Sequence, residues 1–248
     1  NVLGLSTVHM KGREDAEEIR RLLSLCGIRV ISMPGGGSNW DDIMGAPSAS
    51  LNIVVRDELG LSLAKQMEQD FGTPYMSCGL PYGTDGTVAW LSEIIEKLGA
   101  GELTRASHEA AKLKEFLLRK GNNLESLWGP LWFDAVLISA PPSEALGIAE
   151  AIRSEWIDTA RLCIHAQCET EKSTPAADAI RVVMKNEKEI AKDYEDWQGG
   201  LVLSSSHETH LLRRMGRSFT GFHIALPSHD EVHFSDLPQC GLRGAGYL

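Results

Sequence analysis

Short apolar runs alternate with amphipathic stretches over the first hundred residues. Buried strands are predicted where such runs are bounded by turn residues, over Val2–Ser6, Ile28–Met33, Leu51–Val55 and Pro74–Ser77. Helices are predicted where apolar residues recur three and four apart, over Glu14–Leu25, Trp40–Gly45, Leu59–Phe71 and Gly86–Leu98. Strands that alternate with helices predict right-handed βαβ crossovers and a parallel sheet.

The alternation restarts after a long predicted helix, Glu102–Lys120, and a predicted loop, Gly121–Leu131. Further strands are predicted over Phe133–Ala140, Arg161–Ala166, Ile180–Met184, Leu201–Ser205 and Gly221–Leu226. Further helices are predicted over Ser143–Trp156, Glu187–Trp197 and His207–Met215. We therefore predict an α/β protein with two doubly wound, Rossmann-like parallel-sheet domains that face a cleft. The domains are residues 1–100 and 133–248, and residues 101–132 form a long helix and linker.

Composition narrows the class of protein. At 248 residues the chain is long enough for two domains of about 100–150 residues each. The net charge of −10 and the lack of a basic stripe argue against nucleic-acid binding. No run approaches the ~20 apolar residues of a membrane helix, so we expect neither nucleic acid nor membrane as a partner. The start, Asn1-Val2-Leu3, lacks the basic segment of a signal peptide and enters a strand at once, so we expect a fragment of a longer protein.

Two patterns give weak metal signals. Five cysteines, odd in number and scattered, favour reduced thiols in the cytoplasm over a disulfide framework. Cys163-x4-Cys168 is wider than the pairs of structural zinc sites. His229-x3-His233 has the spacing of one helix face, but prolines on both sides favour a surface loop.

Histidines concentrate near the end of the chain, where five of the eight follow residue 206. The strand Leu201–Ser205 leads into Ser206 and His207, and open α/β sheets bind ligands beyond the carboxyl ends of their strands. The helix start there favours an anionic ligand beside Ser205 and Ser206, and ordinary helix capping is the alternative. His223 lies in an apolar strand, as either a hydrogen-bonded core residue or an acid–base group or metal ligand.

Two features of the first half of the chain also lie at the ends of predicted strands, as Ser206 and His207 do in the second half. Gly35, Gly36 and Gly37 follow a predicted strand and precede a helix, where free backbone N–H groups can cradle an anion. A flexible turn is the alternative. Arg56 ends the strand Leu51–Val55, where we expect its charge to face the ligand crevice rather than to be an exposed loop charge.

Several segments, in this order, resemble the nitrogenase component 1 family. Gly12–Val30 is similar to an acidic helix that closes on a G-(I/L)-x-V strand. Leu51-Asn52-Ile53-Val54, Met67-Glu68 and Phe71-Gly72-Thr73-Pro74-Tyr75 match the pattern L-N-(L/I)-V … M-E-x-x-(Y/F)-G-x-P-(W/Y). Gly200–His223 is similar to the family's strand, polar turn, helix with Met215-Gly216, and histidine-bearing strand. The family includes the molybdenum-iron protein subunits, cofactor-assembly relatives and dark protochlorophyllide reductases.

The resemblance implies a fragment that holds the second and third of three α/β domains, and the cysteines that bind an iron–sulfur cluster belong to the first. In nitrogenase, one histidine and one cysteine hold the large metal cofactor. By resemblance the histidine falls on His223, and the cysteine falls on Arg56. A lysine beside the cofactor's organic acid falls on His207, and a nearby arginine falls close to Pro141. These departures imply a reductase without the standard molybdenum-iron cofactor, such as one that acts on a tetrapyrrole.

Three functions follow as hypotheses. The first is the catalytic component of a two-component, ATP-dependent reductase that receives electrons from a separate iron–sulfur ATPase and assembles with a homologous subunit or as a homo-oligomer. In it, His207 and His223 transfer protons or bind metal, and Arg56 holds an anionic group of a substrate or metallocofactor between the domains. The second is a non-catalytic scaffold for metallocofactor assembly. The third is a two-domain protein that binds or transfers a phosphate or other anion.

Overall fold

The computed structural model of the protein describes residues 1–128, 132–156, 158–166, 180–184, 187–229 and 235–247. The chain divides into two compact units. Unit 1 comprises Asn1–Leu127 and Asp236–Leu248, and unit 2 comprises Trp128–Ser235. Unit 2 is therefore inserted into the sequence of unit 1. The bounds expected from the sequence differ from these because the long helix and the last segment both associate with unit 1.

Unit 1 combines a small sheet with helices. Its strands in the described residues are β1 (Val2–Leu3), β2 (Asn52–Val54) and β3 (Tyr75–Ser77). Its helices are α1 (Gly12–Leu25), α2 (Trp40–Gly45), the 3-10 helix η1 (Ala46–Ser48), α3 (Asp57–Phe71), α4 (Thr84–Leu98), α5 (Thr104–Trp128) and α9 (Gly241–Ala245).

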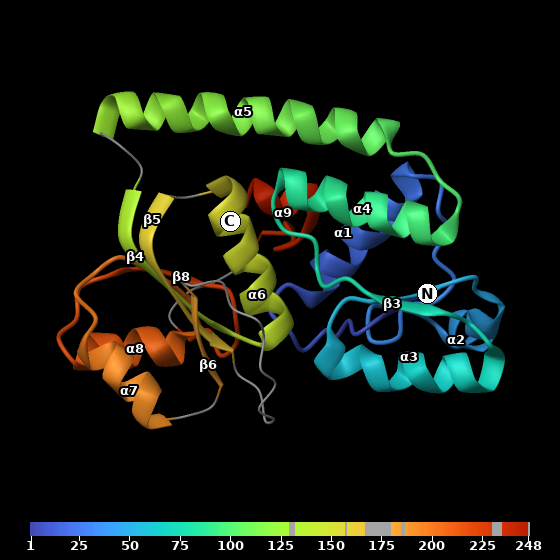
Figure 1. Cartoon of the computed structure of the whole chain (residues 1–248), viewed down its shortest axis with the longest axis horizontal. Helices are drawn as coiled ribbons and strands as arrows, with labels where there is room; N and C mark the ends of the chain where they lie inside the picture. The colour runs from blue at the N-terminus through green and yellow to red at the C-terminus, as the bar shows by residue number, and fades with distance from the viewer. Residues whose placement is uncertain (129–131, 157, 167–179, 185–186, 230–234, 248) are drawn as a thin grey trace. The chain divides into compact units, whose positions relative to one another are not determined.

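The strands of unit 1 form a parallel sheet in the order β1-β2-β3, with Val2 opposite Ile53 and Ile53 opposite Met76. Helix α3 lies on one face, and α1 and α4 lie on the other (Figure 1). Glycine ends two of these helices, since Gly72 after α3 and Gly99 after α4 adopt positive φ angles of 71° and 66°.

The strand predicted over Ile28–Met33 is wrong. The segment has no regular secondary structure, and Val2 N donates to Ser32 O at 2.9 Å. It thus runs beside β1 with one such backbone hydrogen bond. Ile28, Val30 and Ile31 are only half-buried, so the apolar run that suggested a buried strand lies at the margin of the unit.

The loop predicted over Gly121–Leu131 is also wrong in its first part, because α5 continues to Trp128. A glycine inside a helix costs about 1 kcal/mol and an asparagine less. Good helix formers such as Leu124 and Glu125 follow the Gly-Asn-Asn sequence at 121–123, and the cost of these three residues is too small to end the helix. The boundary between the units falls at the end of α5 rather than at Gly121.

Unit 2 is a larger parallel sheet with helices on both faces. Its strands in the described residues are β4 (Trp132–Ala140), β5 (Asp158–Ala166), β6 (Ile180–Met184), β7 (Leu201–Ser204) and β8 (Thr220–His223). Its helices are α6 (Pro142–Ala151), the π-helical turn η2 (Ile152–Trp156), α7 (Glu187–Glu195) and α8 (Ser206–Arg214). The strand order is β6-β5-β4-β7-β8.

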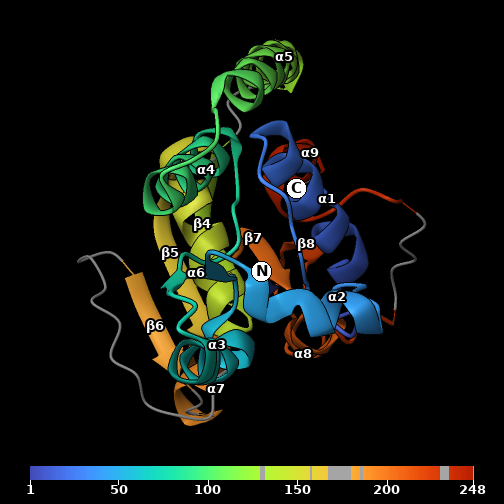
Figure 2. The same ribbon diagram turned by 90° about the vertical axis from the view of Figure 1, so that its right-hand side faces the viewer.

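Alternate residues of the strands in unit 2 face different helices. Helix α6 packs against β4 and β5. Ala135 and Leu137 of β4 join Val202 of β7 in a core cluster with Tyr194 of α7 and Leu212 of α8. Figure 2 shows the same sheet turned by 90°. The predicted α/β class with parallel sheets is confirmed, and none of the helices in the described residues has the length and apolar character to cross a bilayer.

Candidate functional site

The strand order of unit 2 reverses between β4 and β7, which are adjacent and parallel. In an open α/β sheet, the ligand crevice lies beyond the carboxyl ends of the strands at such a reversal. Ser139 lies near this end of β4, and its hydroxyl donates to Glu208 Oε1 of α8 at 3.4 Å. Burial, followed by the nearby Glu208 charge, raises the pKa of Tyr194. Tyr194 also hydrogen-bonds Ser139, so a neutral phenol, a hydroxyl and a carboxylate adjoin.

The start of α8 is closed by its own side chains. Ser205 Oγ accepts from His207 N at 3.1 Å, and Glu208 Oε2 accepts from Ser205 N at 3.1 Å. The Ser205 hydroxyl also donates to Glu208 Oε2. This reciprocal pair is a capping box, which satisfies N–H groups that a helix leaves unpaired at its start. Ser205 thus has the capping role that was the alternative to ligand binding, and ligand binding by it stays a prediction.

Ser206 fastens the loop after β8 to this helix start. Its backbone N–H and its hydroxyl both donate to Pro227 O at 2.8 Å. Its Oγ in turn accepts from His229 N at 3.2 Å. The serine is buried, so a ligand would reach its hydroxyl only after the loop at residues 227–229 moves.

His223, at the end of β8, is 1% exposed and held through both ring nitrogens. Thr209 Oγ1 lies 3.2 Å from Nε2, and Ser228 Oγ lies 3.0 Å from Nδ1. Thr209 donates its own proton to Ser206 O at 3.1 Å, so it accepts from a protonated Nε2. The Ser228 hydroxyl faces Nδ1, so both ring nitrogens of His223 have a hydroxyl partner.

His207 differs from His223 in exposure. It lies in the first turn of α8, and its side chain is exposed, whereas Ser206 and Glu208 beside it are buried. Within the described residues, no hydrogen bond joins the side chain of His207 to that of His223. His229 also belongs to the described part of the chain, whereas His233 and Cys168 lie outside it, so the two weak metal patterns stay untested.

Arg56 in unit 1 follows β2 and precedes α3, and its side chain is 0% exposed. Its Nη1 donates to Gly4 O at 3.4 Å, and its Nη2 lies 3.9 Å from Asp15 Oδ2. Asp15 Oδ1 accepts from Gln239 N at 2.7 Å and from Cys240 N at 3.0 Å. Arg56 is therefore an interior partner of Asp15. Its binding of an anionic ligand, and its convergence with the two histidines, stay predictions.

The glycine turn of unit 1 has a packing explanation. Gly35 and Gly37 adopt positive φ angles of 75° and 95°, and a Cβ on Gly35 would lie 2.3 Å from Leu5 O. Gly36 N donates to Met33 O at 2.8 Å. The helix that follows begins with a capping box of Asn39 and Asp42, whose carboxylate disfavours an anion there. Anion binding by the turn stays a prediction.

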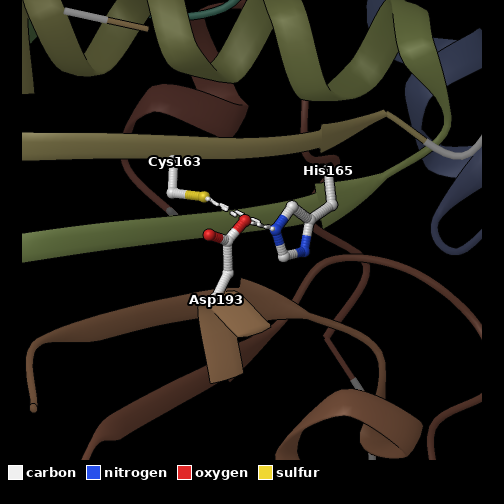
Figure 3. A group of neighbouring side chains, drawn as sticks. All are labelled: Cys163, His165 and Asp193. Atoms are coloured by element: carbon white, nitrogen blue, oxygen red, sulfur yellow. Dashed lines mark hydrogen bonds and ion pairs between the residues drawn. The ribbon is translucent and has the colours of Figure 1, made fainter. Parts of the chain in front are cut away.

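A cluster of potential metal ligands in unit 2 was not predicted from the sequence. Cys163 and His165 of β5 and Asp193 of α7 point toward one another (Figure 3). Cys163 Sγ lies 3.4 Å from His165 Nε2, which lies 3.0 Å from Asp193 Oδ2. The C-x-H spacing inside a predicted strand could have indicated that Cys163 and His165 lie together, because residues i and i+2 share one face of a sheet.

Comparison with known proteins shows one family. The family model described as "Nitrogenase component 1 type Oxidoreductase" matches residues 1–248. The chain is 25% identical over 267 residues to a subunit of the light-independent protochlorophyllide reductase of Prosthecochloris aestuarii, covering 100% of this chain and 49% of that protein. It is 35% identical over 104 residues to the same subunit from Chlorobium phaeovibrioides, covering 41% of this chain and 20% of that one.

Solved structures show the same fold. A structure titled "Nitrogenase Cp1 at pH 6.5" matches with a TM-score of 0.69 and 15% identity, over 95% of this chain and 55% of that chain. The corresponding structure at pH 5 matches with a TM-score of 0.66 and 17% identity. This chain spans about half the length of the relatives that it matches from end to end. Because the family model covers every residue, the chain belongs to the nitrogenase component 1 type oxidoreductase family.

Proposed function

We propose that this chain is part of the catalytic component of a nitrogenase-like, ATP-dependent two-component reductase. A separate iron–sulfur ATPase supplies electrons, and a homologous subunit or a second copy completes the assembly. The observation that carries the proposal is the family match over the whole chain. Matches along the full chain to proteins named as subunits of light-independent protochlorophyllide reductase favour a tetrapyrrole as the substrate.

His223 is the residue proposed to deliver a proton at the carboxyl ends of the strands in unit 2. Its Nδ1 faces the Ser228 hydroxyl, in the loop that Ser206 fastens to α8. Movement of this loop would free Nδ1 while Thr209 keeps Nε2 in place. A histidine with one ring nitrogen free and the other held in place is suited to general acid–base catalysis.

His207 is proposed as a second proton donor or as a charge partner for the substrate. Its exposed side chain lies in the first turn of α8, beside the Ser205 and Glu208 capping box. Its ring N–H can donate a hydrogen bond to a propionate-like carboxylate of a tetrapyrrole. In the proposal Arg56 contacts an anionic group in the same way, which requires its guanidinium to exchange the interior partner Asp15 for the ligand.

The described cysteines do not fit an iron–sulfur cluster. Such a cluster takes several thiolates at one place. Within the described residues, the one metal-capable group of three or more side chains contains a single cysteine, Cys163. Burial also raises the pKa of Cys26, raises that of Cys78 to about 12, and raises that of Cys240 well above its ordinary value. No step of the proposal is therefore assigned to a cluster bound by these thiols.

The test uses the full-length protein that contains this chain, purified without oxygen. It is combined with an iron–sulfur ATPase of the family, ATP, a chemical reductant and protochlorophyllide, and pigment reduction is followed by absorbance. Reduction that stops without ATP supports the proposal. In Arg56→Ala, loss of a charge-assisted contact worth roughly 1.5–3 kcal/mol should raise KM about 10–160-fold.

Two other results would replace the proposal. A protein that accumulates a metallocofactor and passes it on, but reduces nothing, is an assembly scaffold. A full-length product without cluster-binding cysteines ahead of this chain, which binds phosphate at Gly35, Gly36 and Gly37, is an anion-binding protein.

A further inference from the structure

Three potential metal-ligand atoms of unit 2 meet at one point on the sheet. Cys163 Sγ, His165 Nε2 and Asp193 Oδ2 form a triangle with sides of 3.4, 3.0 and 3.6 Å. Cys163 and His165 lie on the same face of β5, because they are two residues apart in a strand. Helix α7 brings Asp193 over that face (Figure 3).

These distances match the spacing of ligands around a tetrahedral zinc ion. Zinc bonds of about 2.3 Å to sulfur and about 2.0–2.1 Å to nitrogen and oxygen, at tetrahedral angles, separate sulfur from nitrogen or oxygen by about 3.6 Å. They separate nitrogen from oxygen by about 3.3 Å. The observed triangle differs from this arrangement by a few tenths of an ångström, so small side-chain rotations would admit the ion.

The arrangement is not that of a nucleophilic triad. In such a triad the histidine uses one nitrogen for the nucleophile and the other for the carboxylate. Here the same nitrogen, His165 Nε2, faces both Cys163 Sγ and Asp193 Oδ2. Convergence of a sulfur, a nitrogen and an oxygen on one point is the geometry of ligands around a metal ion.

The surroundings bury two of the ligands and leave the third partly exposed. The side chain of His165 is 1% exposed, and Cys163 packs in the core cluster with Tyr194 and Trp197. The Tyr194 ring lies 5.5 Å from the His165 ring, tilted by 53°. The Asp193 side chain is 13% exposed, so the cluster is nearest to solvent at Asp193.

We propose that Cys163, His165 and Asp193 bind one zinc ion, with a water molecule in the fourth position. A thiolate with an imidazole selects zinc over magnesium or calcium, which prefer oxygen ligands. Three protein ligands plus water is the pattern of zinc sites that keep an open position. The site lies within unit 2, uses none of the residues proposed for reduction, and stands whether or not the reductase proposal holds.

The experiment titrates the full-length protein, after treatment with a chelator, with zinc or cobalt(II). Cobalt and zinc are counted by mass spectrometry, because these metals are distinct from any iron in the protein. The ligand variants are Cys163→Ser and Asp193→Asn. The matched controls are Cys78→Ser, a thiol of unit 1, and Asp196→Asn, an exposed carboxylate just beyond α7.

We expect one zinc or cobalt ion per chain, and a sulfur-to-cobalt charge-transfer band that Cys163→Ser abolishes. We expect Asp193→Asn, which keeps the shape of a partly exposed side chain, to weaken binding by more than about 100-fold, beyond the cost of losing an outer-sphere partner. Both controls should bind as the unaltered protein does. Absence of saturable binding in the folded protein, or equal binding by Asp193→Asn and Asp196→Asn, would overturn the proposal.

Discussion

Replacing Asp15 by alanine removes the carboxylate that ties the last segment of the chain to α1. Asp15 is 0% exposed and accepts the backbone N–H groups of Gln239 and Cys240. Its other oxygen lies 3.9 Å from Nη2 of the buried Arg56. The substitution leaves two buried N–H groups without this acceptor and deprives a buried guanidinium of this negative charge.

The expected loss of stability follows from these contacts. Removing one partner of a buried ion pair costs about 3–5 kcal/mol, because the remaining charge stays buried. The two N–H bonds to the same carboxylate are part of that loss, since they share one acceptor and do not add independently. A domain has about 5–15 kcal/mol of unfolding free energy in all. Asp15→Ala should therefore remove a large fraction of the stability of unit 1.

The assay is urea unfolding of the full-length protein followed by circular dichroism, with hydrogen exchange to locate the effect. The control is Glu17→Ala, which removes the exposed 3.2 Å ion pair with Arg13 on the same helix and should cost no more than about 0.5 kcal/mol. The double variant Asp15→Ala/Arg56→Met removes the orphaned charge. It should cost less than the sum of the two single changes.

The exchange pattern adds a spatial test. Faster exchange is expected in α1 and in Gln239–Ala245, because these segments share the Asp15 contacts. Strand β4 of unit 2 should exchange as before. If Asp15→Ala costs as little as Glu17→Ala, or if the double variant costs the full sum, the buried carboxylate does not have the role described.

Four further outcomes are expected. Gly200→Ala should lower the melting temperature of unit 2 more than Gly199→Ala does. Both glycines have φ near 127°, but only a Cβ on Gly200 would meet Ala135 O, at 2.1 Å, and thermal melting of the two variants tests this. His223→Gln should lower turnover by about 10²–10⁴-fold with little change in KM if the residue transfers a proton, whereas a parallel loss of metal in elemental analysis would assign it as a ligand. Burial, followed by the Asp15 charge, raises the pKa of Cys240 well above its ordinary value of 9.0. Above about pH 9 the folded protein therefore keeps a proton that the unfolded chain loses, so the free energy of unfolding should fall as pH rises. In urea unfolding, Cys240→Ala should remove this part of the pH dependence. Iron and acid-labile sulfide assays on the isolated chain should find no cluster, and a stoichiometric four-iron cluster would contradict this.

Local patterns were sufficient for most elements. Helix α2 and strand β6 have the bounds that periodicity and turn residues predicted. Periodicity and turn residues act within a few positions of the chain, so they can be interpreted without knowledge of the tertiary structure. The end of α5 was misjudged because turn residues in an exposed helix cost too little to stop it.

Helix α9 was missed for a different reason. Gly241 and Gly244 lower its intrinsic helix propensity. Both glycines are required by close packing, because a Cβ on Gly241 would lie 2.5 Å from Glu18 Cγ, and one on Gly244 would lie 2.4 Å from Gln239 C. Gly241 and Arg243 also contact Glu18, in a helix more than 200 residues earlier, and no local pattern carries that information.

In the candidate site, too, features set by local sequence could be predicted, and features set by tertiary packing could not. The capping box of Ser205 and Glu208 could have been read from the S-x-x-E spacing. His223 was correctly predicted to lie in a strand, but the predicted strand Gly221–Leu226 continued past it, whereas β8 ends at His223. The interior pairing of Arg56 with Asp15 could not, because sequence does not show which buried carboxylate an arginine meets. The approach of Asp193 to β5 likewise depends on how α7 packs over the sheet.

The return of the last segment to unit 1 has a consequence for synthesis on the ribosome. Gln239 meets Asp15 across 224 positions of sequence, and contacts this distant are slow to form. At about 5–20 residues per second, the ribosome needs roughly 5–20 s to make the inserted unit 2. During that time α1 must wait with the Asp15 carboxylate lacking its two backbone donors. The nascent chain therefore passes through a stage in which unit 2 can fold and unit 1 is still incomplete, which is the stage at which chaperone binding or aggregation would compete with folding.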